Sequence, residues 1–525
     1  MINFIVKYQK LSFSIYYWLL VIIAVSMPFS PFLMSLGQIL LLLNWIAEGN
    51  FDEKWRILKI RKSIWFFIAF YLMHIIWLIG TEDWKFTEET LRIKLPMLIL
   101  PIIIGTSKEI PVEKIHTLLK FFIASIISAT IFSLFVYYGF TGHEIKDIRD
   151  ISIFISHIRF SLMIVLCILT ILHWIKEDIR ISKKQFLLVL IVIWFVLFLI
   201  FMKALTGLVI LSVTMFLLIL IFVNRVDNPI LKIFLIIILY SIPFIGIVSI
   251  IKTYNIYYNK NNYNVSQLPM YTPNGNKYLH DTLSWEKENG KLVRLYLCED
   301  ELRKEWNKRS KIKYDSTDKK GQDLKSTLIR YMTSKGLTKD SAGITKLTGK
   351  DIINIEKGLT NYIFEKKWSI TPRLYEVIWE IDHYCHTGST NNQSVTQRFI
   401  YLKIAIYLIK KNFVFGVGTG DLPKEYLNYY ETHNTGLEKD KWWNTHNQYL
   451  RVFATFGLIG FIIFILAFFM PPYFERKYNS YYFIMIFIII LLSFVNEDTL
   501  ETQAGVTFST FFYALFLWGA DRKLK

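Results

Sequence analysis

Three cations and one imidazole stand where the chain changes from polar to apolar, and their types suit one kind of chemistry. Arg159 and Lys203 begin apolar runs, Arg398 opens an amphipathic stretch, and His446 ends a polar stretch before another apolar run. Guanidinium groups stay protonated and pair with phosphate oxygens through parallel hydrogen bonds. A neutral imidazole can accept a proton near pH 7. Together they predict a phosphate-binding site beside a base, whereas each cation alone is typical of a snorkelling interfacial residue and a lone histidine is usually structural.

Three carboxylates are candidates for a supporting role. Glu497 and Asp498 lie in the acidic loop N-E-D-T-L-E, where they could pair with the cations or orient an acceptor; a solvated loop is the alternative. Asp421 follows the glycine-rich run F-G-V-G-T-G at 415–420. That run succeeds an amphipathic stretch and lacks the dinucleotide-binding spacing, so it predicts a tight turn and not a phosphate cradle. We therefore expect Asp421 to be mainly a turn or cap residue.

Metal-ligand residue types occur together between positions 433 and 446. The residues are His433, Glu438, Asp440 and His446. Their spacing fits no standard metal site. We therefore expect neither a metal ion nor another cofactor.

The elements that carry these residues follow from the distribution of charge. The chain has 525 residues, a formal net charge of +18 and 53% hydrophobic residues. Charges fall in short clusters between near-continuous apolar runs, each close to the ~20 helical residues that cross a hydrocarbon core. Because lipid cannot satisfy open strand edges, the runs predict helices. We expect an all-α integral membrane protein with about 12 transmembrane helices, at residues 11–29, 31–47, 63–80, 95–106, 115–140, 158–175, 185–201, 205–223, 233–251, 451–471, 481–496 and 504–519.

The lysines and arginines sort into alternate loops, as the positive-inside rule requires. This sorting places both termini in the cytoplasm and explains much of the +18 without nucleic-acid binding. The organisation predicted is a membrane domain at 1–251, an extracytoplasmic cap at 252–450 and a second membrane part at 451–525. The cap precedes the tenth helix, and its charge pattern predicts a mostly helical structure.

Two features of the cap leave alternatives open. Cys298 and Cys385 would be bridged in an oxidising compartment or remain two thiols, because spacing alone does not decide. Residues 398–412 place Phe399, Leu402 and Ile406 on one helical face. Such a helix lies on the bilayer surface or packs on the cap.

The ordered motifs around this helix resemble a known family. Arg398 and the amphipathic helix are followed by F-G-V-G-T-G, then H-N-Q-Y-L at 446–450, then G-L-I-G at 457–460 inside a predicted span. This order resembles the O-antigen ligase and O-antigen polymerase superfamily of bacterial polysaccharide membrane enzymes. S-H-I-R-F-S-L at 156–162 and K-A-L-T-G at 203–207 are similar to further family features, although Lys203 stands where Ser-Arg-Thr-Gly is more usual and so lacks the guanidinium fork.

The resemblance implies a metal-independent glycosyltransferase in the bacterial inner membrane, acting at its periplasmic face. The donor would be a glycan on undecaprenyl diphosphate, and an O-antigen ligase would pass it to a sugar hydroxyl of lipid A-core in lipopolysaccharide biosynthesis. His446 and Arg398 would be catalytic. Arg159, Lys203 and Arg398 would hold the diphosphate leaving group at the outer membrane boundary.

Other functions stay open at this point. A polysaccharide polymerase or a protein O-oligosaccharyltransferase would use the same donor with a different acceptor. A secondary transporter or lipid flippase also suits twelve spans, but such proteins usually show repeated halves and polar groups near the bilayer midplane. A non-enzymatic scaffold is the third alternative.

Overall fold

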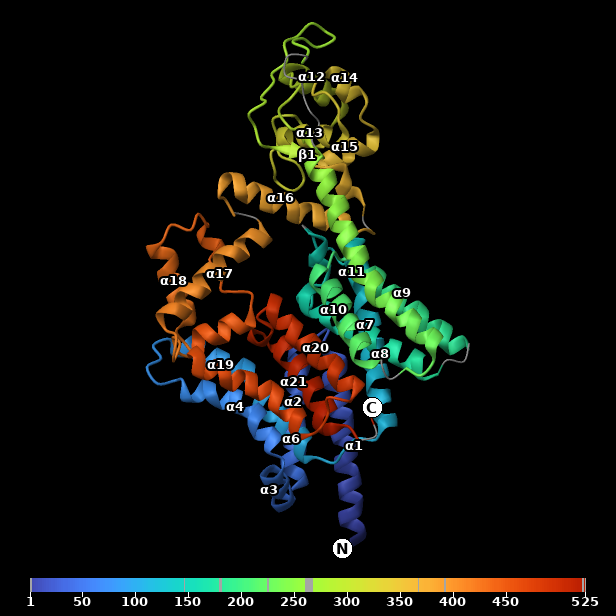
Figure 1. The fold of residues 1–525 in the computed structure, drawn as a ribbon, viewed down its shortest axis with the longest axis vertical. Helices are drawn as coiled ribbons and strands as arrows, with labels where there is room; N and C mark the ends of the chain where they lie inside the picture. Colours follow the sequence, from blue (N-terminus) through green and yellow to red (C-terminus); the bar gives the residue numbers. More distant parts are fainter. Residues whose placement is uncertain are drawn as a thin grey trace. The chain divides into compact units, whose positions relative to one another are not determined.

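The computed structural model describes residues 2–145, 147–178, 182–223, 226–259, 268–366, 368–390, 393–521 and 524. The chain divides into two units, Met1–Leu239 with Asn391–Lys525, and Tyr240–Thr390. Figure 1 shows that the described chain is mostly helical; the only paired strands in it, β1 and β2, form a two-residue ladder. Residues 391–450, which we expect in the cap, group with the first unit.

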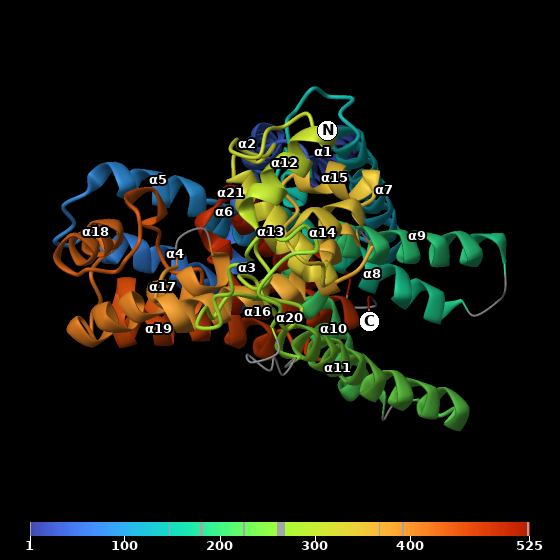
Figure 2. The same ribbon diagram turned by 90° about the horizontal axis from the view of Figure 1, so that it is seen from above.

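The first unit is a bundle of helices. Its closest pairs include α1 with α2, α4 with α19, α6 with α21, and α8 with both α9 and α10, and Figures 1 and 2 show α4 beside α19. The helices are α1 (Ile2–Ser26), α2 (Pro31–Glu48), α3 (Phe51–Ile60), α4 (Lys62–Ile76), α5 (Trp84–Lys94), α6 (Pro96–Thr106), α7 (Val112–Tyr137), α8 (His157–Glu177), α9 (Lys183–Phe201), α10 (Leu205–Phe222), the start of α11 (Pro229–Tyr258), α17 (Ser394–Lys411), α18 (Leu422–Thr432), α19 (Gln448–Phe474), α20 (Tyr481–Asn496) and α21 (Gln503–Ala514).

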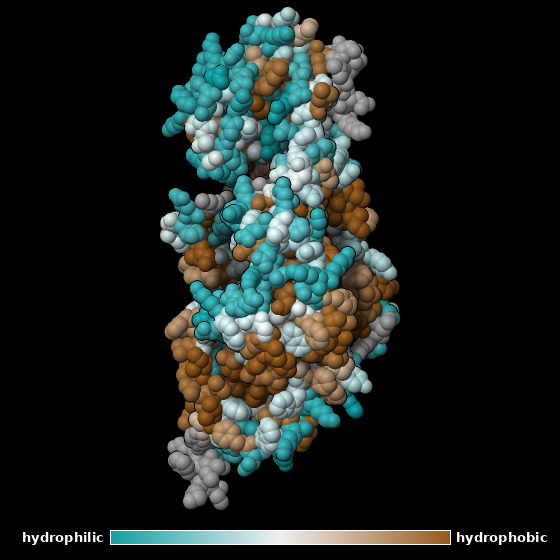
Figure 3. Space-filling view, turned by 90° about the vertical axis from the view of Figure 1, so that its left-hand side faces the viewer, coloured by the Kyte–Doolittle hydropathy of each residue, from teal (hydrophilic) through white to brown (hydrophobic). Residues whose placement is uncertain are grey.

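Every predicted span falls on one of these helices. Among the described residues, eight helices are long and apolar enough to cross a membrane: α1, α2, α7, α8, α9, α10, α11 and α19. The helices α4 and α20 are apolar but shorter, and α6 has 11 residues with Pro101 inside it. The all-α character is confirmed, while the count of twelve spans stays a prediction. Figure 3 shows a broad hydrophobic area on the surface of the first unit. Leu43, Ile193 and Ile462 are among the exposed apolar residues of this unit.

The helix α19 is broken at Gly457, and the backbone of the loop after α17 forms hydrogen bonds with the residues at the break. Gly457 has φ 65° and ψ −166°, a conformation that only glycine adopts readily. The freed amides of Leu458 and Ile459 donate to the carbonyls of Phe413 and Val414, at 2.8 and 3.3 Å. In return, the amides of residues 417 and 418 donate to the carbonyls of residues 454 and 455, at 3.0 and 2.9 Å. Because these four backbone groups of α19 gain partners, a broken helix is tolerated inside the apolar bundle.

The helix α17 packs through a different face from the one predicted to be apolar. Tyr401, Ile404 and Leu408 are buried in a cluster with side chains of α18 and α19. Phe399 and Leu402, on the predicted face, remain exposed. The helix therefore has two apolar faces, one used within the first unit and one left on its surface.

The second unit contains the later part of α11 and a small helical domain. Its elements are β1 (Lys287–Glu288), β2 (Lys291–Leu292), α12 (Glu299–Arg309), α13 (Leu324–Lys335), α14 (Ser341–Thr345), α15 (Gly349–Glu356) and α16 (Thr371–Thr387). Trp306, Tyr314 and Tyr331 are fully buried at its core. Both cysteines of this unit are free thiols, Cys298 buried and Cys385 exposed.

Candidate active site

Residues from five separate parts of the sequence meet within the first unit. They come from the first turn of α8, the first turn of α10, the first turns of α17, the segment before α19 and the end of α20. Their meeting point is Glu497, which directly follows α20 and is 5% exposed.

Two arginines and the histidine approach the Glu497 carboxylate. Arg159 Nη2 lies 3.6 Å from Oε2, and Arg398 Nη2 lies 3.6 Å from Oε1. His446 Nδ1 is 3.7 Å from the same Oε1. The structure therefore brings together three of the four residues that opened the sequence analysis. Arg159 Nε is also buried and has no hydrogen-bond partner among the described residues, so its N–H group is an unsatisfied donor there.

Asn496 connects this cluster to α10. Its side-chain oxygen accepts a 2.6 Å hydrogen bond from Arg398 Nη1, and its side-chain nitrogen donates to Thr206 Oγ1 at 2.7 Å. The next residue of the K-A-L-T-G motif, Gly207, packs so tightly on α8 that an added Cβ would lie 2.6 Å from Ser161 Cβ. The two motifs at the starts of α8 and α10 are thus in direct contact, which explains why each carries a small residue there.

Lys203 lies at the same end of α10 but next to a different acid. Its backbone is left-handed, with φ 54°. Burial tends to raise the pKa of Asp147, but hydrogen bonds from Arg149 and the charges of Arg149 and Lys203 outweigh it and bring that pKa to about 2. The charge of Lys203 therefore acts on the Asp147 carboxylate, whereas Arg159 and Arg398 contact Glu497.

The motif residue Asn447 fixes the histidine in place. Its side-chain oxygen caps α19 by accepting from the amide of Leu450 at 3.0 Å. Its side-chain nitrogen donates to the carbonyl of Val495 at 2.8 Å, at the end of α20. One side chain thus starts α19 and joins it to α20, so His446 is held beside Glu497. The ring of Tyr401 on α17 lies 5.8 Å from the His446 ring.

The next two motif residues join α19 to the same region. Gln448 is fully buried; its Nε2 donates to Glu501 at 3.0 Å, and its Oε1 accepts from the amide of Leu500 at 2.9 Å. Tyr449 donates its hydroxyl to the carbonyl of Leu491 at 3.0 Å. The H-N-Q-Y part of the motif is therefore a set of ties between α19, α20 and the acidic loop.

A second layer of charge lies behind the first, and its two basic residues, Arg451 and Lys94, were not among the predicted site residues. Asp498 Oδ1 is 3.9 Å from His446 Nδ1, while its Oδ2 is 3.3 Å from Arg451 Nη1. Arg451 Nε in turn lies 3.2 Å from Glu501, whose Oε2 accepts a 2.6 Å hydrogen bond from buried Lys94 Nζ. Arg451 and Lys94 were missed because they resemble ordinary charges at helix ends. Arg451 could have been found, since it directly follows H-N-Q-Y-L.

The surroundings set the protonation of the two groups nearest the arginines. Burial and the charge of Asp498 raise the pKa of Glu497 to about 7, against the opposing charges of Arg159 and Arg398. Burial also lowers the pKa of His446, with Asp498 acting to raise it and the nearby arginines acting to lower it further. His446 is therefore neutral at pH 7, the form that accepts a proton.

Asp421 contacts a different part of the fold from the residues around Glu497. Its Oδ1 accepts hydrogen bonds from the amides of Glu82 and Asp83, at 3.0 and 3.1 Å, and so holds the loop between α4 and α5. The glycine-rich run before it forms the predicted tight turn, with positive φ at Gly416 and Gly418. These features give Asp421 the character of a cap residue.

Three of the site residues have the donor types of a metal centre. Ligand atoms of His446, Glu497 and Asp498 all lie within 4.8 Å of one another. The same carboxylates are approached by Arg159, Arg398 and Arg451, whose positive charges oppose a cation. His433, named in the sequence analysis as a ligand type, instead stacks on the ring of Tyr429 at 4.0 Å.

Comparison with known proteins gives one match. No curated protein matches the sequence. The family model described as O-antigen ligase matches residues 354–465, a range that contains Arg398, the glycine-rich turn, the H-N-Q-Y-L motif and Gly457. Over these residues the chain is similar to the O-antigen ligase family.

Proposed function

We propose that this protein is an O-antigen ligase-like glycosyltransferase, which moves a glycan from undecaprenyl diphosphate to a sugar hydroxyl of lipid A-core. The family match supports an enzyme with a lipid-linked glycan donor and a glycan acceptor. The eight long apolar helices and the family together support a multi-pass bacterial membrane protein. On the topology predicted from the lysines and arginines, the site faces the periplasm and both termini are cytoplasmic.

The observation that carries the proposal is the convergence of Arg159 and Arg398 on one buried carboxylate. Both contacts are 3.6 Å long, well outside the 2.7–2.9 Å of a tight charged hydrogen bond. Glu497 therefore lies beside both guanidinium groups. A donor diphosphate would supply an acceptor for the buried Nε of Arg159. Lys203 adds positive charge at the same end of α10.

The reaction then follows from the positions of the groups. The acceptor hydroxyl attacks the anomeric carbon of the donor sugar as the bond from that carbon to the phosphate oxygen breaks. The electron pair leaves with undecaprenyl diphosphate, and the arginines stabilise the charge that grows on it. The hydroxyl proton passes to His446 at Nε2, since Nδ1 is the nitrogen nearer the acids, and then to water. Glu497 and Asp498 stabilise the imidazolium that forms. No metal ion is needed, because the arginines provide the positive charge.

The proposal is tested by transfer in vitro with purified protein, a defined undecaprenyl-diphosphate glycan and lipid A-core. We expect transfer by the wild-type protein, with or without a chelator, and a loss of at least about 100-fold in His446→Ala and Arg398→Ala. Asp421→Asn is the matched control, because Asp421 is a conspicuous polar residue of the same matched range that caps another loop. Normal transfer by both site variants would overturn the site assignment.

The same assay separates the related activities. Polymer growth with a second lipid-linked repeat as acceptor would identify a polymerase, and modification of a protein hydroxyl would identify an oligosaccharyltransferase. In cells, loss of a ligase leaves lipid A-core unmodified with lipid-linked glycan accumulating outside. Loss of a flippase would instead leave the glycan on the cytoplasmic face.

A further inference from the structure

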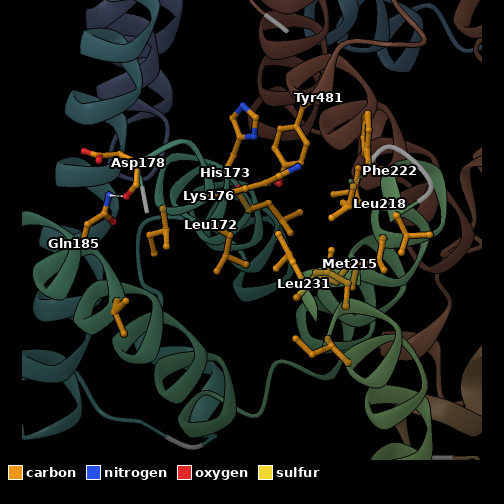
Figure 4. Close-up of a pocket in the computed structure, with 18 of the residues that line it drawn as sticks. Leu172, His173, Lys176, Asp178, Gln185, Met215, Leu218, Phe222, Leu231 and Tyr481 are labelled. Atoms are coloured by element: carbon orange, nitrogen blue, oxygen red, sulfur yellow. Dashed lines mark hydrogen bonds between the residues drawn. The ribbon is translucent and has the colours of Figure 1, made fainter. Parts of the chain in front are cut away.

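A large cavity lies at the end of the bundle opposite the candidate active site. Its volume is about 600 Å³, within the ~300–1,000 Å³ typical of sites for small molecules. Most of its wall is apolar, and Figure 4 shows Leu172, Met215, Leu218 and Leu231 around it. These side chains come from α8, α10 and the start of α11. A wall of this kind is suited to hydrocarbon chains.

Three polar side chains line the cavity. Lys176 and Asp178 come from the end of α8 and Gln185 from the start of α9. In Figure 4 the Lys176 side chain extends toward Tyr481, away from Asp178 and Gln185. The Gln185 side-chain nitrogen donates to the Asp178 carbonyl, the bond drawn in Figure 4. Its side-chain oxygen is buried without a hydrogen-bond partner among the described residues, and Gln185 is only 8% exposed.

The charge beside these polar side chains favours an anionic ligand. Lys176 lines the cavity, and Lys183 and Lys184 open α9 directly after the lining residue Ser182. Asp178 is the one acidic residue among the lining side chains. The stacked rings of His173 and Tyr481, 4.1 Å apart, close the side next to α20. The cavity is thus mostly apolar, and Lys176 gives it a cationic group in its lining.

The cavity and the active site share helices but are well separated. Arg159 and Lys176 are 17 residues apart on α8, which corresponds to about 25 Å along a helix axis. That distance is close to the thickness of a hydrocarbon core, so the two sites lie near opposite membrane surfaces. A diphosphate held by Arg159 therefore cannot also be the headgroup at Lys176.

We propose that this cavity binds the acyl chains of an anionic phospholipid. The phosphate lies against Lys176, and the chains fill the space between α8, α10 and α11. The lipid is a resident of the membrane leaflet opposite the glycan donor. It stabilises the cavity-lining ends of the same helices that present Arg159 and Thr206 to the active site.

The test is native mass spectrometry of delipidated protein titrated with phosphatidylglycerol, phosphatidylethanolamine or undecaprenyl phosphate. We expect one phosphatidylglycerol per chain, bound more tightly than phosphatidylethanolamine. Met215→Trp fills the cavity and should weaken this binding at least tenfold. Leu220→Trp is the matched control, because Leu220 is exposed on the same helix and does not line the cavity. Lys176→Gln, at an exposed position where folding is not at risk, should reduce the preference for phosphatidylglycerol about fivefold.

Several outcomes would overturn the proposal. These are unchanged binding in Met215→Trp with a normal melting temperature, no preference between the two phospholipids, or exclusive binding of undecaprenyl phosphate, which would make the cavity a site for the polyprenyl chain. Arg398→Ala separates this proposal from the proposed function. It should bind phosphatidylglycerol normally while failing in glycan transfer.

Discussion

At the scale of single residues, the three predicted cations are not equivalent. Arg398 contacts Glu497 and Asn496, and Arg159 contacts Glu497, whereas Lys203 stands near Asp147. We therefore expect Lys203→Ala to lower glycan transfer about tenfold and Arg398→Ala by at least about 100-fold, the usual loss when a preorganised donor to a transition-state anion is removed. Initial rates with purified protein measure this difference. An equal loss in both variants would mean that Lys203 moves to the diphosphate when the donor binds.

The pKa of Glu497 predicts how donor binding depends on pH. Because this pKa is about 7, Glu497 is increasingly neutral below pH 7 and anionic above it. The anion competes with the donor diphosphate for Arg159 and Arg398. The KM for the donor should therefore rise as pH increases through about 7.

A neutral replacement isolates this effect. Glu497→Gln keeps the shape of the side chain without its charge, so the KM for the donor should stay low and flat across the same pH range. Measuring the KM for the donor between pH 6 and 8.5 in both proteins tests whether Glu497 is the group that titrates. An unchanged pH dependence in the glutamine variant would assign the titration to another group.

At the scale of elements, two glycines allow the loop after α17 to lie against the break in α19. A Cβ on Gly457 would lie 2.2 Å from the carbonyl oxygen of Val414, and one on Gly416 would lie 2.3 Å from that of Thr455. Gly457→Ala should therefore lower the melting temperature and the transfer rate together, since strain of this kind costs about 1–3 kcal/mol before any clash is added. Gly246→Ala in α11 is the control, because a Cβ added at Gly246 would have no neighbour within 4 Å and Gly246 has no positive φ. Thermal unfolding in detergent tests both, and wild-type stability in Gly457→Ala would contradict the loop pairing.

This pairing also shows what the sequence could and could not predict. The apolar runs placed all twelve expected spans on helices, because a helix is the structure that satisfies its own backbone in lipid. The positive φ of Gly416 follows from local turn chemistry and was predicted as a tight turn. The contact between Gly416 and α19 joins segments 40 residues apart and leaves no local pattern.

The residues of the candidate site likewise divide into those that the sequence predicted and those that it did not. His446, Arg159 and Arg398 were predicted from residue type and their place at the ends of spans. The buried pairs of Arg451 with Glu501 and of Lys94 with Glu501 were not, because burial and ion pairing of charges depend on which helices become neighbours. Lys203 has a left-handed backbone at the turn before α10, and its charge acts on Asp147. Its binding of the diphosphate together with the arginines stays a prediction.

At the scale of the whole molecule, the distribution of lysine and arginine predicts which parts of the chain face which compartment. Residues on the second unit should lie outside the cytoplasm, and residues of α3 should lie inside. Cys385 is an exposed thiol of the second unit, while Cys167 and Cys298 are buried. Lys59 is exposed on α3 and offers a matched position for a new cysteine.

Labelling with a membrane-impermeant maleimide tests this orientation directly. In intact spheroplasts Cys385 should react, and the label should be lost in Cys385→Ser. Lys59→Cys, introduced into the Cys385→Ser protein, should react only after the membrane is permeabilised, because the predicted topology keeps α3 in the cytoplasm. The reverse pattern would place the His446 end of the bundle in the cytoplasm, where a periplasmic transfer to lipid A-core could not take place.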